Sequence, residues 1–160
     1  ILCAKYRKGH FEGVIDVMDR LTSKIKPRKI FMGEKDFQQF YLVRNYIEKK
    51  YKSKIIRCKT IRDIGKLAWS SRNRLLNKKE LLKARKIAKD LIIYKKKLNN
   101  KKITITSLNA KKLELIKKYK IKIEYFELRD DTNLKLSNKI KNSKIFIAYY
   151  INKVRLIDNF

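Results

Sequence analysis

The residues best suited to chemistry in this chain lie in a short run, Gly33-Glu34-Lys35-Asp36, that follows an apolar segment. We expect this run where a strand ends and a helix begins, which is where open α/β sheets bind ligands. Gly33 would let backbone approach a nucleotide closely, Lys35 could meet phosphate charge, and Asp36 could accept hydrogen bonds from both ribose hydroxyls. An ordinary turn in which Asp36 caps the following helix explains the same residues. Residue types alone leave both interpretations open.

Two glutamines, Gln38 and Gln39, follow on the expected helix. They lie about 100° apart around its axis, so they cannot both face the same environment. One of them could point into the ligand crevice and hold a hydroxyl or carboxylate of a small polar substrate. Periodicity does not choose between the two.

A second polar cluster, Ser70-Ser71-Arg72-Asn73, places two hydroxyls, a permanent cation and an amide in four residues. These are groups that bind phosphate, and the loop before them could let them move towards a ligand. A surface turn before a helix is an equally good interpretation. Upstream, Ile61 could offer an adenine ring a hydrophobic wall and backbone contacts.

Other kinds of catalytic centre find little support in the sequence. His10 is the single histidine, so no second histidine exists for a metal pair or a proton relay, and a structural role is expected for it. Cys3 and Cys58 are too few and too far apart for a disulfide framework or a zinc site, and we expect both to be reduced. No metal site is predicted from the side chains.

The elements that must position these residues follow from hydrophobic periodicity. Ile1 to Tyr6 reads as the end of a strand, and the chain is expected to be truncated at its start. Helices are predicted from Phe11 to Ile25, where Pro27 ends the helix, and from Asp36 to Lys50. The expected inner faces carry Phe11, Val14, Ile15, Met18, Leu21 and Ile25 in the first, and Phe37, Phe40, Tyr41, Arg44 and Ile47 in the second. Strands are predicted over Lys29 to Met32, as a buried strand, and over Lys54 to Lys59. The alternation of strands and helices along the chain predicts a parallel sheet with right-handed crossovers.

The pattern changes after Thr60, where we place a domain boundary between residues 1–60 and 61–160. Asn77 is expected to cap a long basic helix from Lys78 to about Leu98. Its core-facing side is expected to carry Leu81, Leu82, Arg85 by its stem, Ala88, Ile92 and, in part, Tyr94. Further expected elements are a helix over about Ala110 to Tyr119 and strands over Lys122 to Leu128, Lys144 to Ile151 and Val154 to Ile157, with a hairpin turn at Asn152-Lys153. The second region is thus a small α+β unit.

The net charge of +29 is the strongest compositional feature. A basic protein of this kind can bind nucleic acid. The charge comes mostly from lysine, is spread along the chain, and accompanies abundant Ile and Asn with only 4 Gly and 1 Pro, a bias typical of an AT-rich genome. Nucleic-acid readers favour arginine for contacts to guanine. We therefore prefer base composition as the source of the charge and keep nucleic-acid binding as the alternative.

The sequence has no run of about 20 uncharged apolar residues, the length needed to span a bilayer. The opening Ile1-Leu2-Cys3 is interrupted by Lys5 too early for a signal peptide. We therefore expect a cytoplasmic protein.

Taken together, five segments resemble bacterial pantoate-β-alanine ligases over essentially the whole chain, in order and in spacing. They are Arg7 to Val14 (RKGHFEGV), Phe31 to Gln39 (FMGEKDFQQ), Thr60 to Asn73 (TIRDIGKLAWSSRN), Ile123 to Asp130 (IEYFELRD) and Arg155 to Asn159 (RLIDN). The resemblance implies an α/β fold: the C-terminal part of a Rossmann-like parallel-sheet nucleotide-binding domain in residues 1–60, followed by a small α+β lid in residues 61–160.

The resemblance also implies an activity. In this family pantoate attacks the α-phosphate of ATP, pyrophosphate leaves, and β-alanine captures the pantoyl adenylate to give pantothenate and AMP, with Mg²⁺ accompanying ATP. By analogy, Lys35 contacts the phosphates, Gly33 and Asp36 hold the ribose, Gln39 rather than Gln38 binds pantoate, and Ile61 supports adenine. Ser70, Ser71 and Arg72 would close on the triphosphate. A homodimer without nucleic-acid or membrane partners is implied for the full-length protein.

Two departures from the family pattern stand out. The loop that usually reads Asp-Gly before Leu-Ala here reads Gly65-Lys66, which affects its expected conformation. The adenylate-forming motif His-x-Gly-His is absent, and His10 does not replace it. We therefore expect this chain alone to be unable to make pantothenate.

Overall fold

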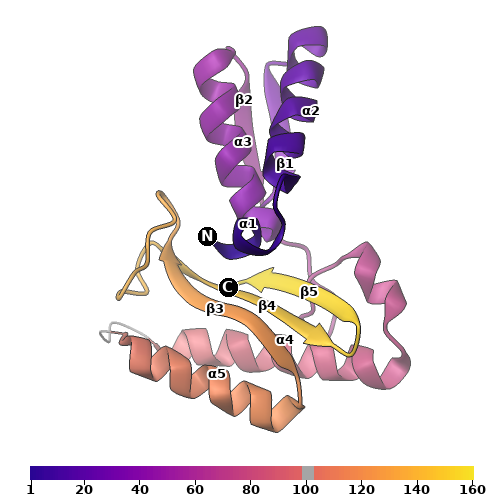
Figure 1. Ribbon diagram of the computed structural model, residues 1–160, viewed down its shortest axis with the longest axis vertical. Helices are drawn as coiled ribbons and strands as arrows, with labels where there is room; N and C mark the ends of the chain where they lie inside the picture. Colours follow the sequence, from indigo (N-terminus) through magenta and orange to yellow (C-terminus); the bar gives the residue numbers. More distant parts are fainter. Residues whose placement is uncertain (99–102) are drawn as a thin grey trace. The chain divides into compact units, whose positions relative to one another are not determined.

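The computed structural model describes residues 1–98 and 103–160 of the chain (Figure 1). The chain divides into two compact units, Ile1–Thr60 and Ile61–Phe160. Each unit has its own sheet and its own helices, and each is described by itself below.

The first unit is built on a two-stranded parallel sheet. Its helices are α1 (Leu2–Tyr6), α2 (His10–Ile25) and α3 (Phe37–Lys50), its strands are β1 (Lys29–Gly33) and β2 (Lys54–Cys58), and the single-turn 3₁₀ helix η1 (Glu34–Asp36) joins β1 to α3. The strands pair in register from Lys29 opposite Lys54 to Gly33 opposite Cys58. The predicted parallel pairing is confirmed, and helix α3 packs on both strands and on α2.

The start of the chain is helical, so the predicted strand over Ile1 to Tyr6 is wrong. A short apolar run does not distinguish strand from helix by its periodicity. The deciding contact comes from α3: the Gln38 amide donates to the Ile1 carbonyl at 3.0 Å and accepts from the Ala4 backbone N–H at 3.4 Å. These bonds hold helix α1 in place, with Leu2 and Cys3 buried.

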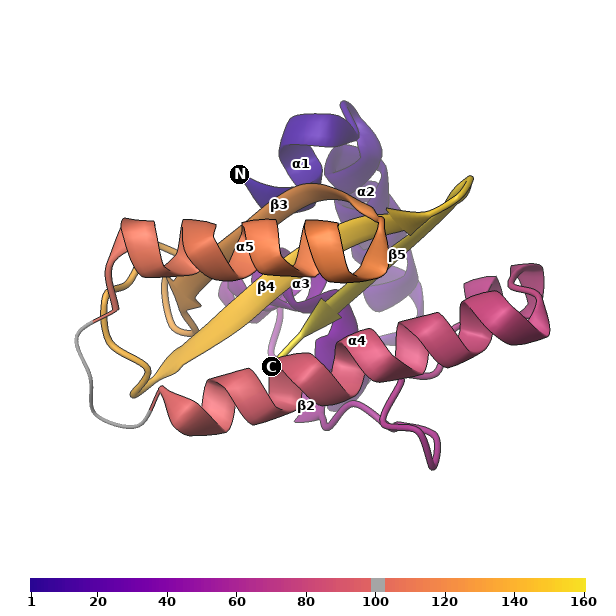
Figure 2. The same ribbon diagram turned by 90° about the horizontal axis from the view of Figure 1, so that it is seen from below.

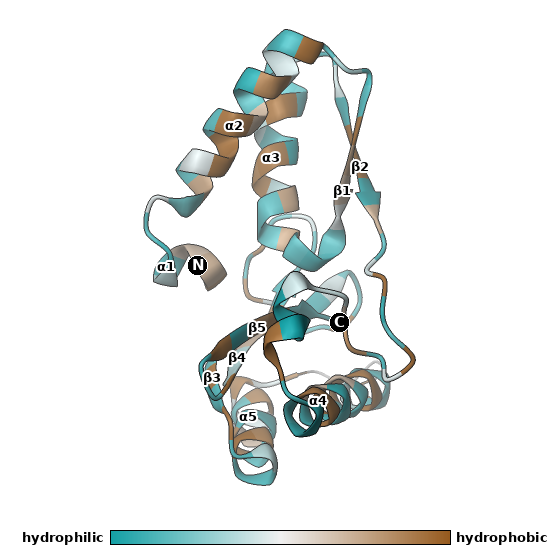
Figure 3. Ribbon diagram, turned by 90° about the vertical axis from the view of Figure 1, so that its right-hand side faces the viewer, coloured by the Kyte–Doolittle hydropathy of each residue, from teal (hydrophilic) through white to brown (hydrophobic). Residues whose placement is uncertain are grey.

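Three burial predictions in this unit also need correction. On α2, Leu21 and Ile25 are 48% and 67% exposed, while Thr22 is buried. Figure 3 shows hydrophobic residues recurring along α2 between hydrophilic ones. The less exposed positions of this helix include the predicted Phe11, Ile15 and Met18, and the buried Thr22 takes the place of Leu21 and Ile25.

Strand β1 is not the buried strand that was predicted, because Phe31 is 67% exposed. With only β2 beside it among the described residues, β1 keeps one edge and part of one face in contact with solvent. On α3, Val43 belongs to the buried side with Phe37, Phe40 and Ile47, whereas the expected Tyr41 and Arg44 are only half-buried.

The second unit packs two helices on one face of a three-stranded antiparallel sheet (Figures 1 and 2). Its elements are the 3₁₀ helix η2 (Ser71–Leu75), helices α4 (Lys78–Lys97) and α5 (Ile105–Tyr119), and strands β3 (Lys122–Asp130), β4 (Ser143–Ile151) and β5 (Val154–Asn159). Strands β4 and β5 form the predicted hairpin through Asn152 and Lys153. The core lies between the helices and the sheet, around Leu91, Leu115, Ile145 and Ile147.

Helix α4 begins as predicted, because Asn77 accepts from the Glu80 backbone N–H and Glu80 accepts in return from the Asn77 N–H. The predicted face is shifted, since Leu82 is 54% exposed. The buried stripe runs instead through Ala84, Ile87, Ala88 and Leu91, where two alanines allow close approach to the sheet.

Helix α5 begins at Ile105, five residues before the predicted start. Thr104 caps it by accepting from the Ser107 N–H at 3.1 Å, and the Ser107 hydroxyl accepts from the Thr104 N–H at 3.2 Å. This reciprocal cap uses serine where the usual motif has Glu or Gln, so the sequence pattern did not reveal it.

Candidate functional site

The run Gly33 to Asp36 lies at the carboxyl ends of both parallel strands. Gly33 is the last residue of β1 and pairs with Cys58, the last residue of β2. The turn is fixed to β2 by Glu34, which accepts from the Thr60 N–H at 3.4 Å and lies 3.7 Å from the Arg57 guanidinium. The structure thus places the Gly33 turn at the sheet edge where parallel α/β folds bind ligands.

Gly33 is not required by the conformation or packing of the described chain. Its φ of −69° and ψ of 131° are open to any residue. A Cβ atom built there would meet no atom within 4 Å among the described residues. The exposed Gly33 backbone can therefore be approached closely by another molecule.

Asp36 occupies the cap position of α3, but in the described part of the chain its carboxylate makes no capping hydrogen bond. Asp36 therefore stands where a helix cap is expected, but its side chain does not cap the helix. The carboxylate is exposed and can bind a ligand hydroxyl.

The two glutamines have different surroundings. Gln38 is 8% exposed, and its amide bonds the backbone of Ile1 and Ala4. Gln39 is half-buried on the neighbouring face of α3. The structure therefore gives Gln38 a structural role within the unit.

The segment from Ile61 to Asn73 belongs to the second unit. The Ser70 hydroxyl accepts from the Arg72 N–H at 3.3 Å and caps η2, and the Asn73 amide donates to the Ala68 carbonyl at 3.0 Å. Arg72 reaches β5, where it donates to the Arg155 carbonyl at 3.3 Å. Ser71 is exposed at the surface of this turn. The polar cluster is thus a compact, capped turn seated beside β5.

Arg155, which accepts the bond from Arg72, is itself held by an ion pair across the sheet. Its guanidinium donates to Glu124 at 3.0 and 2.6 Å. The hydrogen bond from Arg155 lowers the pKa of the Glu124 carboxyl, against the opposing effect of burial. The carboxylate therefore stays charged, and the ion pair keeps the strand under Arg72 in place.

A turn between Arg62 and Lys66 precedes the cluster and is anchored at several points. Asp63 accepts from the Leu67 N–H at 2.9 Å and pairs with the Arg85 guanidinium of α4 at 2.7 Å. Gly65 lies directly under the Arg85 stem, since an added Cβ atom would be 2.5 Å from Arg85 Cγ. Glycine is therefore required at position 65 by packing.

The structure brings the candidate residues together in two groups. Gly33, Lys35, Asp36 and Gln39 lie around one strand-to-helix junction in the first unit, and Ile61, Ser70, Ser71 and Arg72 lie along one segment of the second. His10 is the first residue of α2 and contacts the Phe11 ring.

Residues that the sequence interpretation missed include Arg62 and Trp69. Arg62 binds Asp158 and the Asn159 carbonyl of β5, partners 96 and 97 residues away, for which no local pattern exists. Trp69 is a large aromatic residue directly before Ser70, and it is 63% exposed. Its position next to the candidate phosphate-binding residues was the available signal.

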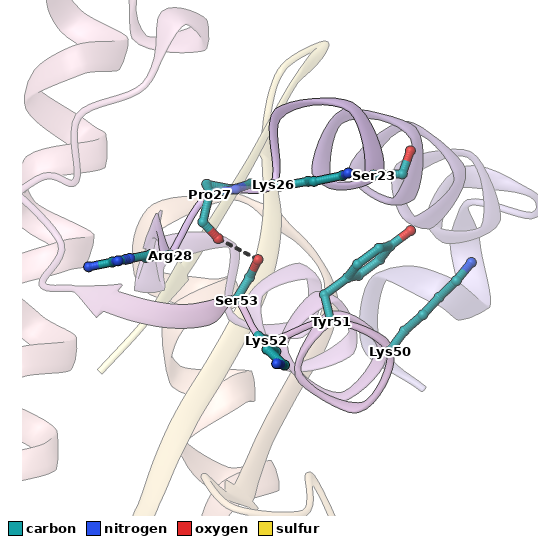
Figure 4. A pocket seen from close by; sticks show the side chains of 8 residues that line it. All are labelled: Ser23, Lys26, Pro27, Arg28, Lys50, Tyr51, Lys52 and Ser53. Atoms are coloured by element: carbon teal, nitrogen blue, oxygen red, sulfur yellow. Dashed lines mark hydrogen bonds between the residues drawn. The ribbon is translucent and has the colours of Figure 1, made fainter.

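A cavity of about 580 Å³ lies elsewhere in the first unit (Figure 4). It is lined by residues that precede β1 and β2, among them Lys26, Pro27, Arg28, Tyr51 and Ser53. This is the amino-terminal end of the strands, opposite to the Gly33 turn. The cavity is therefore separate from the candidate nucleotide site.

Neither cysteine forms a disulfide: Cys3 is buried and Cys58 is half-buried. In residues 1–98 and 103–160, no cluster of three metal-ligating side chains is found. Within the same ranges, no helix has the length and apolar character needed to cross a membrane.

Comparison with known proteins gives a consistent result. All 160 residues match the family described as pantoate-β-alanine ligase. The chain belongs to the pantoate-β-alanine ligase family. A pantothenate synthetase of Flavobacterium psychrophilum is 38% identical to this chain, and the match covers 97% of this chain and 56% of the relative. A pantothenate synthetase of Fervidobacterium nodosum is 33% identical, and the match covers 99% of this chain and 57% of the relative. The resemblance inferred from the five segments is confirmed.

Solved structures of the family show the same fold. Pantothenate synthetase of Thermus thermophilus matches with a TM-score of 0.90 and 25% identity, covering 100% of this chain and 59% of that chain. Pantoate-β-alanine ligase of Francisella tularensis, complexed with β,γ-ATP and β-alanine, matches with a TM-score of 0.74 and 35% identity. This match covers 100% of this chain and 53% of that chain. The mixed α/β fold, with one parallel and one antiparallel sheet, is that of the family. The chain spans a little over half the length of these relatives.

The turn between Arg62 and Lys66 holds Lys66 in an unusual backbone conformation. This residue has a φ of 71°, in the left-handed region that favours glycine. A lysine side chain at this position therefore strains the turn.

Proposed function

We propose that the protein containing this chain condenses pantoate with β-alanine at the expense of ATP. Pantoate attacks the α-phosphate and pyrophosphate leaves, and the amine of β-alanine then captures the pantoyl adenylate, giving pantothenate and AMP. One observation carries the proposal: a family match over residues 1–160 coincides with a glycine-lysine-aspartate turn at the carboxyl ends of two parallel strands.

The first unit supplies one group of contacts as the proposed C-terminal part of a Rossmann-like nucleotide-binding domain, residues 1–60. The open approach to Gly33 and the exposed carboxylate of Asp36 suit the ribose. Lys35 would contact the phosphates as a mobile cation. Gln39 is assigned to pantoate, and the structural bonds of Gln38 support this choice.

The second unit, residues 61–160, is proposed to act as a lid. Ile61 would support adenine, and Ser70, Ser71 and Arg72 would close on the triphosphate. The Arg72 guanidinium uses one Nη atom on the Arg155 carbonyl and has further donors for phosphate oxygens. Magnesium would accompany ATP, because this ion binds mainly phosphate and water and needs few protein oxygens.

The proposed catalysis is electrostatic. Charge builds up on the α-phosphate and on the departing pyrophosphate, and preorganised cations in a partly desolvated cleft stabilise it, one well-placed donor by about 3 to 4 kcal/mol. Lys35, Ser70, Ser71 and Arg72 are the residues assigned to this task. Because no His-x-Gly-His motif occurs in the sequence, we propose that the chain alone is inactive. For the whole enzyme we propose a cytoplasmic homodimer, by family resemblance.

Nucleic-acid binding is the second candidate function, favoured by the net charge of +29. Equilibrium dialysis of labelled ATP and of a short DNA duplex with the full-length protein, at increasing salt concentration, separates the two functions. Binding to DNA phosphates should fall by roughly 0.9 log unit per contact for each log unit of salt. Saturable ATP binding that persists at salt concentrations abolishing DNA binding supports the ligase. Tight DNA binding without ATP binding contradicts it.

A further inference from the structure

The side of helix α4 that faces away from the sheet carries a continuous basic surface. At about 100° per residue, eight of its 20 residues fall within an arc about 100° wide. All eight are exposed, and six of them are lysines: Lys78, Lys79, Leu82, Lys86, Lys89, Ile93, Lys96 and Lys97. Leu82 lies about two and a half turns from the fully buried Leu91, so the arc points away from the core. We call these eight residues the α4 outer face.

No carboxylate neutralises the α4 outer face within residues 1–98 and 103–160. The two acidic residues of α4, Glu80 and Asp90, lie outside the arc. Glu80 accepts from the Asn77 N–H at 2.8 Å in the helix cap. Asp90 accepts from Lys111 at 2.7 Å and from Lys118 at 2.9 Å, both on α5. Since none of the six lysines forms an ion pair in the described ranges, the face keeps six positive charges.

Two large aliphatic side chains stand among these lysines. Leu82 and Ile93 are 54% and 52% exposed. They are eleven residues apart, close to three full turns, so they lie along one line of the helix with lysines on both sides. Helix α5 lies beside α4 on the same face of the sheet (Figure 2). Its Leu113 is 57% exposed, on the side roughly opposite to the buried Leu115. The helical layer therefore presents aliphatic groups to solvent next to its lysines.

The combination of charge and aliphatic groups indicates the kind of partner. Base composition raises the number of lysines, but it does not explain a face that lacks carboxylates and exposes Leu82 and Ile93. A nucleic acid backbone offers phosphates to the lysines and no apolar layer to the two aliphatic side chains. A bilayer with anionic headgroups offers both, because lysines interact with the headgroups while aliphatic side chains enter the boundary with the acyl chains. Clusters of about four to eight basic residues on an amphipathic helix are typical of such binding.

We propose that the α4 outer face binds a membrane surface that contains anionic lipids, with the helix lying parallel to the bilayer and without crossing it. Leu82 and Ile93 enter the interfacial region, and the lysines contact the charged headgroups. The stem of each lysine can lie along the apolar boundary while its ammonium group stays in water. This inference does not depend on the proposed function, and it goes beyond the family resemblance, which implies no membrane partner.

The test is sedimentation of the full-length protein with two kinds of vesicle, one of phosphatidylcholine alone and one of phosphatidylcholine mixed with phosphatidylglycerol. We expect binding to the anionic vesicles only. The binding should weaken as the salt concentration rises, because salt screens the lysines. Equilibrium dialysis with a short DNA duplex under the same conditions measures the competing partner.

One pair of variants tests the charges. Lys86→Gln combined with Lys89→Gln should weaken binding to anionic vesicles about 25-fold, at about fivefold per lysine. Lys29→Gln combined with Lys54→Gln is the matched control, since it removes two exposed lysines at the paired starts of β1 and β2 and gives the same net charge. The control should bind vesicles nearly as well as wild type.

A further variant tests the aliphatic groups. Leu82→Ala combined with Ile93→Ala keeps every charge and good helix formers, so the helix should persist, as circular dichroism would show. It should weaken binding to anionic vesicles at least about tenfold and leave DNA binding unchanged.

Each contrary result overturns the proposal in a different way. Absence of binding to anionic vesicles, or equal binding to neutral ones, removes the lipid partner. Equal losses in the α4 lysine variant and the control variant assign the binding to net charge. Vesicle binding that is unchanged in Leu82→Ala with Ile93→Ala, beside tight DNA binding that the α4 lysine variant loses, assigns the face to nucleic acid. The ligase is measured without vesicles, so its assay stands apart from these results.

Discussion

The Arg62 guanidinium and the Asp158 carboxylate form a bidentate ion pair, with Nη1 to Oδ2 at 2.7 Å and Nη2 to Oδ1 at 2.9 Å. The Arg62 side chain is 19% exposed and that of Asp158 is 6% exposed. Arg62 also donates to the Asn159 carbonyl at 3.0 Å and stacks over the Phe160 ring. The segment that begins with Ile61 is thereby attached to the last strand of its unit.

Breaking this pair should destabilise the second unit. Removing one partner of a largely buried ion pair leaves the other charge without compensation, at a cost of about 3 to 5 kcal/mol. We expect Asp158→Ala to show such a loss in urea denaturation of the full chain, followed through Trp69 fluorescence. Arg20→Ala, which removes an exposed pair with Asp16 on α2, should change the unfolding free energy by less than about 1 kcal/mol. Equal effects of the two substitutions would show that the Arg62 pair does not hold the segment.

The Gly65-Lys66 turn offers two adjacent substitutions with opposite expected signs. Gly65→Ala places a Cβ atom against the Arg85 stem and must displace Arg85 from Asp63, so we expect a loss of about 1 to 3 kcal/mol. Lys66→Gly relieves a left-handed residue and should raise stability by about 1 kcal/mol. Thermal denaturation of both variants measures the difference, and a stabilising Gly65→Ala would refute the described packing.

Acid sensitivity should arise partly from Asp90 on α4. Burial alone would raise the pKa of this carboxyl, but hydrogen bonds from Lys111, Lys118 and Tyr119 outweigh it, so the pKa is lowered. A carboxyl with a lowered folded pKa contributes stability above its unfolded pKa, about 3.9, and loses it as the pH falls through the folded value. We expect Asp90→Asn to be less stable at neutral pH and to lose less stability than wild type on acidification below about pH 4. Urea denaturation midpoints of both proteins, measured across this pH range, test the prediction. The same pH dependence of the midpoint in Asp90→Asn and in wild type would contradict it.

Substitution of the two neighbouring glutamines tests whether Gln38 has a structural role and Gln39 a role in pantoate binding. Gln38→Ala removes both bonds to α1, so we expect faster amide hydrogen exchange in Leu2–Tyr6. Gln39→Ala should leave that exchange unchanged and raise the KM for pantoate in a full-length enzyme carrying this segment. The proposed division of roles fails if Gln38→Ala raises the KM and Gln39→Ala leaves it unchanged.

Local patterns in the sequence were enough to predict the parallel pairing of β1 with β2, the Asn77 cap and the β4–β5 hairpin. Each depends on residues close together in the chain or on strand order. The helix at Leu2–Tyr6 was not predictable in this way, because the Gln38 amide that holds it lies on another helix.

The candidate site was predictable to the same extent. Residue types suggested Gly33, Lys35 and Asp36, but only the order of five segments along the chain made the family recognisable. The contacts that anchor the second group depend on β5, which supplies Asp158 and the Arg155 carbonyl from the far end of the sequence. Such long-range partners leave no mark in local spacing.

Pantothenate formation tests the central claim, that this chain carries the ATP- and pantoate-binding residues of a ligase. The enzyme to assay joins the amino-terminal segment of the Flavobacterium psychrophilum relative to this chain. Lys29, exposed at the opposite end of β1 from the Gly33 turn, gives the matched control variant Lys29→Ala.

We predict β-alanine-dependent release of pantothenate and AMP by the joined enzyme and none by the chain alone. Single-turnover adenylation should fall at least about a hundredfold in Lys35→Ala and stay unchanged in Lys29→Ala. A folded joined enzyme that makes no pantothenate, or a Lys35→Ala variant that forms the adenylate at the wild-type rate, would contradict the account.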